Sequence, residues 1–256
     1  MKQFLTKAKI IENVEVGPNL FRLIFEAEEI AETAKAGQFV MVKTATEVSD
    51  DPILRRPFSI HRVDGKKVSI LYKVVGRGTT ILAKQQNEID LVGPLGNGFF
   101  IPEEGSLAIV GGGLGIAPLL FVAQQALRQG YKEENIQILL GARSSAEFPV
   151  VDDFRQMGLK VRTATDDGSA GHHGLVTELM DMEGDWTVLT CGPAPMMQAV
   201  AKKCGEKNWD CQVSLETTMA CGMGACLGCA VQGNVKHEYK HVCKDGPVFQ
   251  ASDVCL

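Results

Sequence analysis

The sequence predicts an antiparallel β barrel, then an α/β domain built on a parallel sheet, then a small C-terminal module. Residues 1–101 hold short stretches rich in β-branched and aromatic residues, separated by turn signals. Residues 102–211 alternate short apolar stretches with helical patterns, which is typical of βαβ units. Over residues 212–256 glycine and cysteine become dense and helical periodicity disappears, so we expect a module organised by a metal centre.

The first segment contains the hairpins that a barrel needs. Apolar stretches flank the turn signal Gly17-Pro18-Asn19, and Asp64-Gly65 is a hairpin turn before the β-rich stretch 67–75. Residues 38–43 add another strand, and residues 79–86 predict one short helix.

The second segment predicts four parallel strands. A helix with clear apolar periodicity is expected over residues 117–127. The apolar stretches that predict the strands lie at residues 107–110, 136–140, 159–163 and 187–191.

The composition limits the partners and the compartment. A net charge of −5 argues against a nucleic-acid or anionic-membrane partner. No run of about 18 apolar residues is present, so we expect no membrane span. The N-terminus lacks an apolar signal core, so we expect a cytoplasmic protein, in which eight cysteines indicate metal ligation or reduced thiols.

Four cysteines near the C-terminus have the spacing of metal ligands. Cys221, Cys226 and Cys229 form the C-x4-C-x2-C pattern of plant-type [2Fe–2S] centres, and Cys243 supplies a fourth thiolate. The glycines between them let backbone N–H groups come close to sulfur. Zinc and unligated core cysteines are the alternatives, but zinc ribbons usually have two C-x2-C pairs and this segment has one.

The segments Arg56-Pro57-Phe58-Ser59 and Gly76-Arg77-Gly78-Thr79 point to a flavin nucleotide. Arg56 would pair with a pyrophosphate, and Ser59 would hydrogen-bond the flavin ring. Gly78 and Thr79 open a short helical segment, where backbone N–H groups can hold phosphate. A solvated arginine and a plain tight turn are the alternatives.

Two turns that link a strand to a helix indicate a dinucleotide site. The glycine-rich turn 111–115 and the turn at 191–192 both follow strands, and the carboxyl ends of parallel strands share one crevice. The first turn departs from the G-x-G-x-x-G fingerprint, so a connection without ligand is its alternative, and a buried small hydrophobe is the alternative for Cys191. The residues expected at the crevice are Gly111, Gly112, Gly113, Gly115, Cys191 and Gly192.

Two aspartates follow the expected strand at residues 159–163. If Asp166 and Asp167 face the adenosine ribose, they repel a 2′-phosphate and bind a 2′-hydroxyl, which favours NAD over NADP. Solvated turn aspartates are an equally good explanation. His172 and His173 in the same loop receive no role.

The order of these motifs resembles the ferredoxin–NADP reductase superfamily, with its RPxS, GxGT, GGGxGxAP and CGPxPM segments. The cysteine segment 219–229 and the segment CKDGPVF at 243–249 resemble the electron-transfer subunits of class 1B dihydroorotate dehydrogenases, over essentially the whole chain. The resemblance implies an FAD-binding barrel over 1–101, a Rossmann-like NAD-binding domain over 102–211 and a [2Fe–2S] module over 212–256.

The resemblance also implies which residues hold the cofactors. The cluster ligands would be Cys221, Cys226, Cys229 and Cys243. The FAD contacts would be Arg56, Pro57, Phe58, Ser59, Leu71, Tyr72, Lys73, Gly78 and Thr79.

By the same resemblance, a partner subunit with FMN oxidises dihydroorotate in pyrimidine (UMP) biosynthesis. Electrons then pass through the cluster and FAD to NAD⁺, and the expected assembly is a heterotetramer with two copies of each chain. No motif in this chain fits acid–base chemistry on dihydroorotate. We therefore expect an oxidoreductase subunit without catalytic side chains of its own, which does not oxidise dihydroorotate alone.

An FAD/[2Fe–2S] subunit of an NAD(P)H–ferredoxin or sulfide oxidoreductase is the alternative function. Similar transhydrogenase subunits typically have an aspartate as first ligand, where this chain has Cys221. Relatives that prefer NADP usually carry a Ser-Arg pair near the Asp166 position, and this chain lacks it. A zinc-stabilised binding module is the non-redox alternative, but it leaves the first two segments without a purpose.

Overall fold

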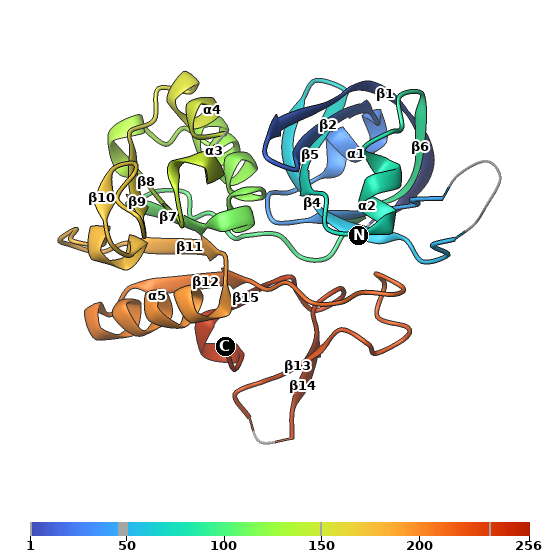
Figure 1. Cartoon of the computed structure of the whole chain (residues 1–256). Coiled ribbons are helices and arrows are strands. Elements are labelled where there is room, and N and C mark those ends of the chain that lie inside the picture. Colours follow the sequence, from blue (N-terminus) through green and yellow to red (C-terminus); the bar gives the residue numbers. More distant parts are fainter. Residues whose placement is uncertain (1, 46–50, 149, 236) are drawn as a thin grey trace.

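Six antiparallel strands close into a barrel in the N-terminal part of the chain (Figure 1). The computed structural model describes residues 2–45, 51–148, 150–235 and 237–256. The barrel strands pair in the order β1-β2-β5-β4-β3-β6. Their bounds are β1 Phe4–Gly17, β2 Leu20–Glu26, β3 Phe39–Val42, β4 Arg56–Asp64, β5 Lys67–Lys73 and β6 Glu88–Leu95, with helices α1 Glu28–Thr33 and α2 Arg77–Leu82.

Both predicted hairpin turns are confirmed, and both contain a residue with left-handed backbone. Asn19 has φ 56° between β1 and β2, and Gly65 has φ 55° between β4 and β5. The short helix α2 begins at Arg77 rather than at residue 79, because the Gly76 carbonyl already accepts the N–H of Thr80 at 2.9 Å.

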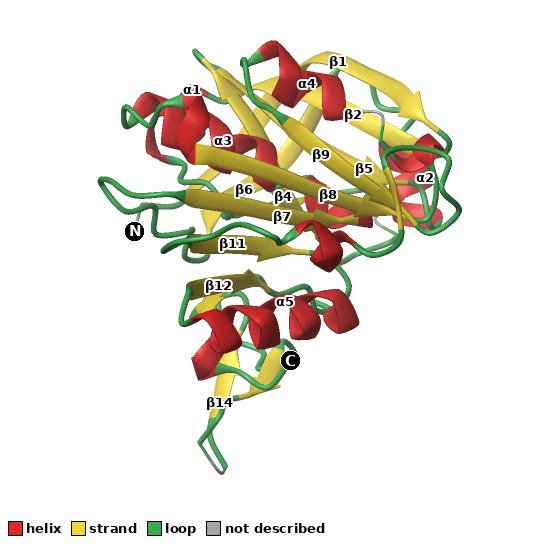
Figure 2. Ribbon diagram, turned by 90° about the vertical axis from the view of Figure 1, so that its left-hand side faces the viewer, coloured by secondary structure: helices red, strands yellow, loops and turns green. Residues whose placement is uncertain are grey.

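A seven-stranded sheet forms the second part of the fold, in the order β10-β9-β8-β7-β11-β12-β15 (Figure 2). All its pairings are parallel except that of β15 with β12. The four predicted parallel strands are present as β7 Leu107–Gly112, β8 Ile136–Ala142, β9 Val161–Thr165 and β11 Thr187–Cys191, and the other strands are β10 His172–His173, β12 Asp210–Ser214 and β15 Val248–Gln250.

Helices cover this sheet, and one of them joins it to the barrel. The helix α3 contacts both β4 of the barrel and β7 of the sheet, whereas α5 packs on β11 and β12 (Figure 2). No helix in the described part of the chain is long and apolar enough to cross a membrane. The α-helices are α3 Leu119–Arg128, α4 Val151–Gln156 and α5 Ala194–Lys207, and the 3₁₀ helices are η1 Gly113–Ile116, η2 Glu133–Asn135, η3 Ser145–Glu147, η4 Val176–Leu179 and η5 Ala251–Asp253.

The C-terminal part of the chain is anchored on the sheet. Its hairpin consists of β13 Ala230–Gln232 and β14 Tyr239–His241, and projects away from both larger parts (Figure 1). The strand β15 returns to pair with β12, so the module contributes a strand to the parallel-sheet part. The boundary expected between residues 211 and 212 falls within β12.

A buried asparagine ties the barrel wall to the end of α2. The Asn13 side chain in β1 donates to the carbonyls of Leu82 (2.8 Å) and Gln85 (3.0 Å). Its Oδ1 accepts the Tyr72 hydroxyl at 3.0 Å. Burial raises the pKa of Tyr72 to about 12, so this hydroxyl stays a donor at every physiological pH.

We expect Asn13→Ala to lower the free energy of unfolding by about 2–4 kcal/mol, because it removes three hydrogen bonds and leaves the buried Tyr72 hydroxyl without its acceptor. Tyr72→Phe removes only one of these bonds and should cost about 1 kcal/mol. Urea denaturation under identical conditions measures both values. An Asn13→Ala variant no less stable than Tyr72→Phe would show that the asparagine does not hold α2.

Candidate cofactor and cluster sites

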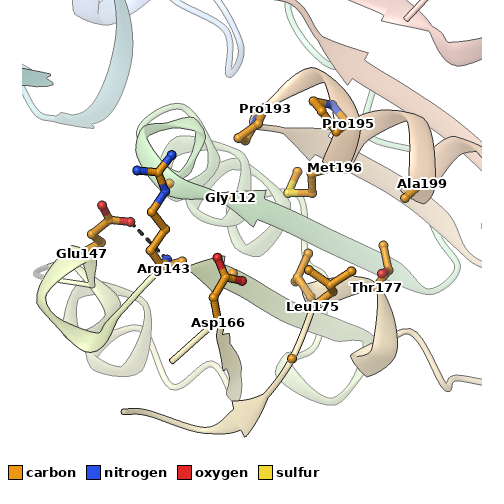
Figure 3. A pocket seen from close by; sticks show the side chains of 15 residues that line it. Gly112, Arg143, Glu147, Asp166, Leu175, Thr177, Pro193, Pro195, Met196 and Ala199 are labelled. Carbon is orange, nitrogen blue, oxygen red and sulfur yellow. Dashed lines mark hydrogen bonds between the residues drawn. The ribbon is translucent and has the colours of Figure 1, made fainter. Parts of the chain in front are cut away.

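A cavity of about 380 Å³ opens at the carboxyl ends of the parallel strands (Figure 3). We call it the sheet-end cavity. Gly112 and Gly113 form part of its wall, together with the ends of β8 and β9 and the start of α5. A Cβ on Gly112 would lie 2.3 Å from the Met196 Sδ, so a larger residue where β7 passes the start of α5 would displace the Met196 side chain. The predicted position of a ligand crevice is thus where the structure has a cavity.

The other residues predicted at this crevice pack behind its wall. A Cβ on Gly115 would lie 2.4 Å from the Cys191 carbonyl oxygen, so the glycine turn lies directly against the β11–α5 turn. Gly111 is less tight, with 2.8 Å from such a Cβ to the Leu119 side chain. Gly111, Gly115, Cys191 and Gly192 do not line the sheet-end cavity. Burial raises the pKa of Cys191 far above its usual range, so its thiol stays neutral.

Three charged side chains lie on one side of the sheet-end cavity. Asp166, Arg143 and Glu147 face Pro193 and Met196 on the other side (Figure 3). The sequence analysis singled out Asp166 but missed the other two charged residues. Arg143 directly follows β8, just as Asp166 directly follows β9. This shared position at the end of a parallel strand could have identified Arg143 from the sequence.

Asp167 behaves as a turn residue. Its Oδ1 accepts the Ser169 N–H at 2.9 Å and the Ser169 hydroxyl at 2.6 Å. These bonds lower the pKa of Asp167. His172 and His173 are exposed in β10, and His172 contacts Glu178.

A second cavity, of about 300 Å³, lies between the barrel, the glycine turn and the segment after β12. We call it the barrel cavity. Leu114 and Ala117 come from the glycine turn and its end, and Glu216 and Met219 come from the segment after β12. Eight predicted FAD contacts line it: Arg56, Pro57, Phe58, Ser59, Leu71, Tyr72, Lys73 and Thr79.

The remaining predicted contact, Gly78, shapes the approach to Arg56. A Cβ on Gly78 would lie 2.9 Å from the Thr44 Oγ1 and 3.3 Å from the Arg56 Nε. Thr79 fixes the same turn, since its Oγ1 accepts the N–H groups of Val75 (3.0 Å) and Gly76 (3.2 Å). The Thr79 hydroxyl is therefore hydrogen-bonded within the turn. A phosphate bound here would contact the Thr79 backbone instead.

The walls of the barrel cavity fit a flat aromatic ring joined to a pyrophosphate. Tyr72 stacks on Phe21 and tilts against Phe58, with ring centroids 5.6 and 5.5 Å apart, so this wall is aromatic. Arg56 supplies a cation near the start of α2. Glu216, which the sequence analysis did not single out, adds a carboxyl group. Its side chain is exposed to the cavity, yet the surrounding protein raises its pKa by desolvation.

The four candidate ligand cysteines lie in two pairs. The Sγ atoms of Cys229 and Cys243 are 3.2 Å apart, and both side chains are buried. The Cys221 sulfur accepts the N–H of Cys226 at 3.4 Å and also contacts that cysteine's thiol. No group of three or more His, Cys, Asp or Glu among the described residues is arranged to hold a single metal ion. Two pairs fit two bridged irons better than the four-fold set that one zinc ion needs.

Backbone N–H groups point at these sulfurs, as a thiolate cluster requires. Gly224 donates to the Cys243 Sγ at 3.0 Å, and Met223 donates to the Cys221 Sγ at 3.5 Å. Gly222 and Gly224 have φ of 71° and 80°, which turn the loop inward. Burial opposes ionisation of the Cys221 thiol, but the backbone hydrogen bonds outweigh it and lower its pKa to about 6.

Two family models match the chain. Residues 109–202 match an oxidoreductase NAD-binding domain. Residues 216–255 match the iron–sulfur cluster binding domain of dihydroorotate dehydrogenase B. The second match contains all four candidate ligand cysteines.

Relatives match over nearly the whole length. The dihydroorotate dehydrogenase B (NAD⁺) electron transfer subunit of Desulforamulus reducens is 40% identical, covering 96% of this chain and 97% of the relative. The subunit of the same name from Clostridium acetobutylicum is 38% identical over 100% and 99%. A chain from the structure of an NADH-dependent reduced ferredoxin–NADP oxidoreductase superposes with a TM-score of 0.83 at 30% identity, over 97% of this chain and 89% of that one. This chain belongs to the family of dihydroorotate dehydrogenase B (NAD⁺) electron transfer subunits.

Proposed function

We propose that this chain passes electrons from an FMN-containing dihydroorotate dehydrogenase subunit to NAD⁺ in pyrimidine (UMP) biosynthesis. One observation carries the proposal: the barrel cavity borders both the sheet-end cavity and the loop that holds the four cysteines. Leu114 of the glycine turn and Met219, two positions before Cys221, line the same cavity. When bound, FAD supplies the exchange between single electrons and a hydride, and the cluster supplies single-electron transfer. The chain's own residues hold these groups next to one another.

The cysteine pairs indicate how the cluster is held. Cys221 and Cys226 would ligate one iron, and Cys229 and Cys243 the other. Cys226 is exposed, whereas Cys229 and Cys243 are buried. The first pair is therefore the one nearer to the surface.

The exposed end of the cluster loop is where we place the partner subunit. Met223 and Leu227 flank Cys226 and are 54% and 58% exposed. Exposed apolar side chains beside a redox centre suit a protein interface that also excludes water. We propose a heterotetramer with two copies of each chain, and the cytoplasmic location stays a prediction from the sequence.

In the sheet-end cavity, Asp166 and Arg143 would bind the nicotinamide dinucleotide. The Asp166 carboxylate would accept a ribose hydroxyl and repel a 2′-phosphate. The Arg143 guanidinium lies on the same side and would pair with the pyrophosphate. Gly112 and Gly113 line the cavity without side chains, which leaves room for the phosphates of the dinucleotide.

The direct test adds dihydroorotate and NAD⁺ to the complex purified anaerobically, and follows NADH at 340 nm. We expect NADH formation that stops when the partner subunit is removed, because we assign the oxidation of dihydroorotate to that subunit. The isolated chain should still oxidise NADH with ferricyanide. An intact, cofactor-loaded complex that forms no NADH would instead favour a ferredoxin-linked reductase.

Cys226→Ser should abolish NADH formation from dihydroorotate while FAD stays bound, because an alcohol is a poor ligand for iron in a thiolate cluster. Cys255→Ser is the matched control, since Cys255 is exposed and its thiol contacts the Gly233 carbonyl and the Asn234 side chain. Iron content and flavin absorbance are measured on both variants. Normal coupled turnover of Cys226→Ser would contradict the ligand assignment.

Asp166→Ser should lower the preference for NADH over NADPH about tenfold, or about 1.4 kcal/mol, by removing charge repulsion of the 2′-phosphate. Asp167→Ser is the control, because its carboxylate is used by Ser169 and does not line the cavity. The ratio of kcat/KM for the two nucleotides with ferricyanide gives the result. Equal changes in both variants would show that Asp166 does not face the ribose.

A further inference from the structure

A third cleft, of about 400 Å³, lies where the barrel meets α3 and α4. Arg22, His61, Arg62 and Lys67 contribute from the barrel, and Asp153 contributes from α4. It shares no lining residue with the barrel cavity. None of the cofactor roles proposed above uses the side chains of this cleft.

His61 reaches the cleft through a β-bulge. The pairing of β4 with β5 runs from Ile60↔Ile70 directly to Arg62↔Ser69, so His61 is the extra residue of β4. A regular strand would send His61 and Arg62 to opposite faces, whereas here both line the cleft. Bulges of this kind re-aim side chains and often lie beside functional sites.

The His61 ring has one nitrogen paired and one unpaired. Only 1% of the residue is exposed, and its Nδ1 donates to the Ala117 carbonyl at 2.6 Å. This bond fixes the proton on Nδ1, so Nε2 is an acceptor, and no described residue donates to it. Burial lowers the pKa of His61 to about 4, so the ring is neutral at physiological pH. A buried acceptor without a donor is unfavourable, which calls for a ligand that brings one.

Two arginines at the mouth of the cleft also have unused donors. The Nε atoms of Arg22 and Arg62 are buried without an acceptor in the described structure. Arg22 lies 3.6 Å from Asp153 and 3.8 Å from Glu12, which is longer than a hydrogen bond. Both side chains are partly exposed, by 31% and 36%. Arg62 also pairs with Asp64 at 2.9 Å, so a ligand that reaches His61 would compete with that carboxylate for the Arg62 guanidinium.

The charge of the cleft favours an anion that also carries hydroxyl groups. Among the residues that line the cleft, three cations, Arg22, Arg62 and Lys67, face two carboxylates, Asp64 and Asp153, and Glu12 lies outside the lining at 3.8 Å from Arg22. Guanidinium groups match phosphate oxygens with paired N–H donors. The two carboxylates would repel a bare anion, but they accept hydroxyl donors, as does the His61 Nε2.

We propose that this cleft binds a sugar phosphate, either free or as part of a nucleotide. The phosphate lies on Arg22 and Arg62, and a sugar hydroxyl donates to the His61 Nε2. The volume lies in the range of small-ligand pockets. Because His61 bonds Ala117, which lines the barrel cavity, a ligand held here is one hydrogen bond away from the flavin site.

Isothermal titration calorimetry of the cofactor-loaded complex tests the proposal. Saturating NAD⁺ in phosphate-free buffer blocks the sheet-end cavity. We expect saturable binding of ribose 5-phosphate, at least about tenfold tighter than that of ribose or inorganic phosphate, since each alone lacks half of the contacts. Uridine 5′-monophosphate separates the two sources: binding tighter than ribose 5-phosphate identifies a nucleotide, and weaker binding identifies the free sugar phosphate. No saturable binding of either ester, or equal binding of inorganic phosphate, would overturn the proposal.

Variants locate the binding. Arg62→Gln should weaken binding about tenfold by removing a charged donor. His61→Asn keeps an amide donor for the Ala117 carbonyl but lacks Nε2, and should weaken ribose 5-phosphate more than inorganic phosphate. Arg155→Gln is the control, because Arg155 lies on α4 beside the cleft, pairs with Asp152 and lines no part of it. If His61→Asn does not fold, the test rests on Arg62→Gln, because Arg62 is partly exposed. Equal affinity of Arg62→Gln and Arg155→Gln for ribose 5-phosphate would overturn the assignment.

Discussion

The arrangement of both cofactor cavities depends on how closely the glycine turn after β7 approaches the end of β11. At Gly115 that approach leaves 2.4 Å between a hypothetical Cβ and the Cys191 carbonyl oxygen, so no other residue fits without movement of the backbone. The turn thereby places Gly113 in the sheet-end cavity and Leu114 in the barrel cavity. Neighbouring residues of one tight turn thus separate the sheet-end cavity from the barrel cavity.

Much of the fold follows from local patterns in the sequence. The apolar stretches gave the positions of β7, β8 and β11 to within two residues, because strands inside a parallel sheet are buried on both faces. The strand β9 begins at Val161 rather than at residue 159, and its first three residues are only half-buried. The strand β15 was not predicted. It has three residues, and its place beside β12 depends on contacts far along the chain.

The candidate sites divide in the same way. Segments that carry their own turn chemistry, such as Arg56–Ser59 and the cysteine loop, were found from sequence. Arg143 and Glu216 were missed, because a single charge after a strand looks like a solvated surface residue until the strand order is known. Conversely, the sequence marked Cys191 and Gly115 for a ligand, and the structure places them in the packing between two turns.

The pairing of β15 with β12 gives the C-terminal module a role in the sheet itself. A chain shortened to its first 211 residues would end inside β12 and lack the strand that covers it. The remaining sheet would present an open, apolar edge, which invites strand exchange and aggregation between copies. The C-terminal module therefore also covers an edge of the parallel sheet. A protein that exchanged this module for another would need a different strand or loop to cover that edge.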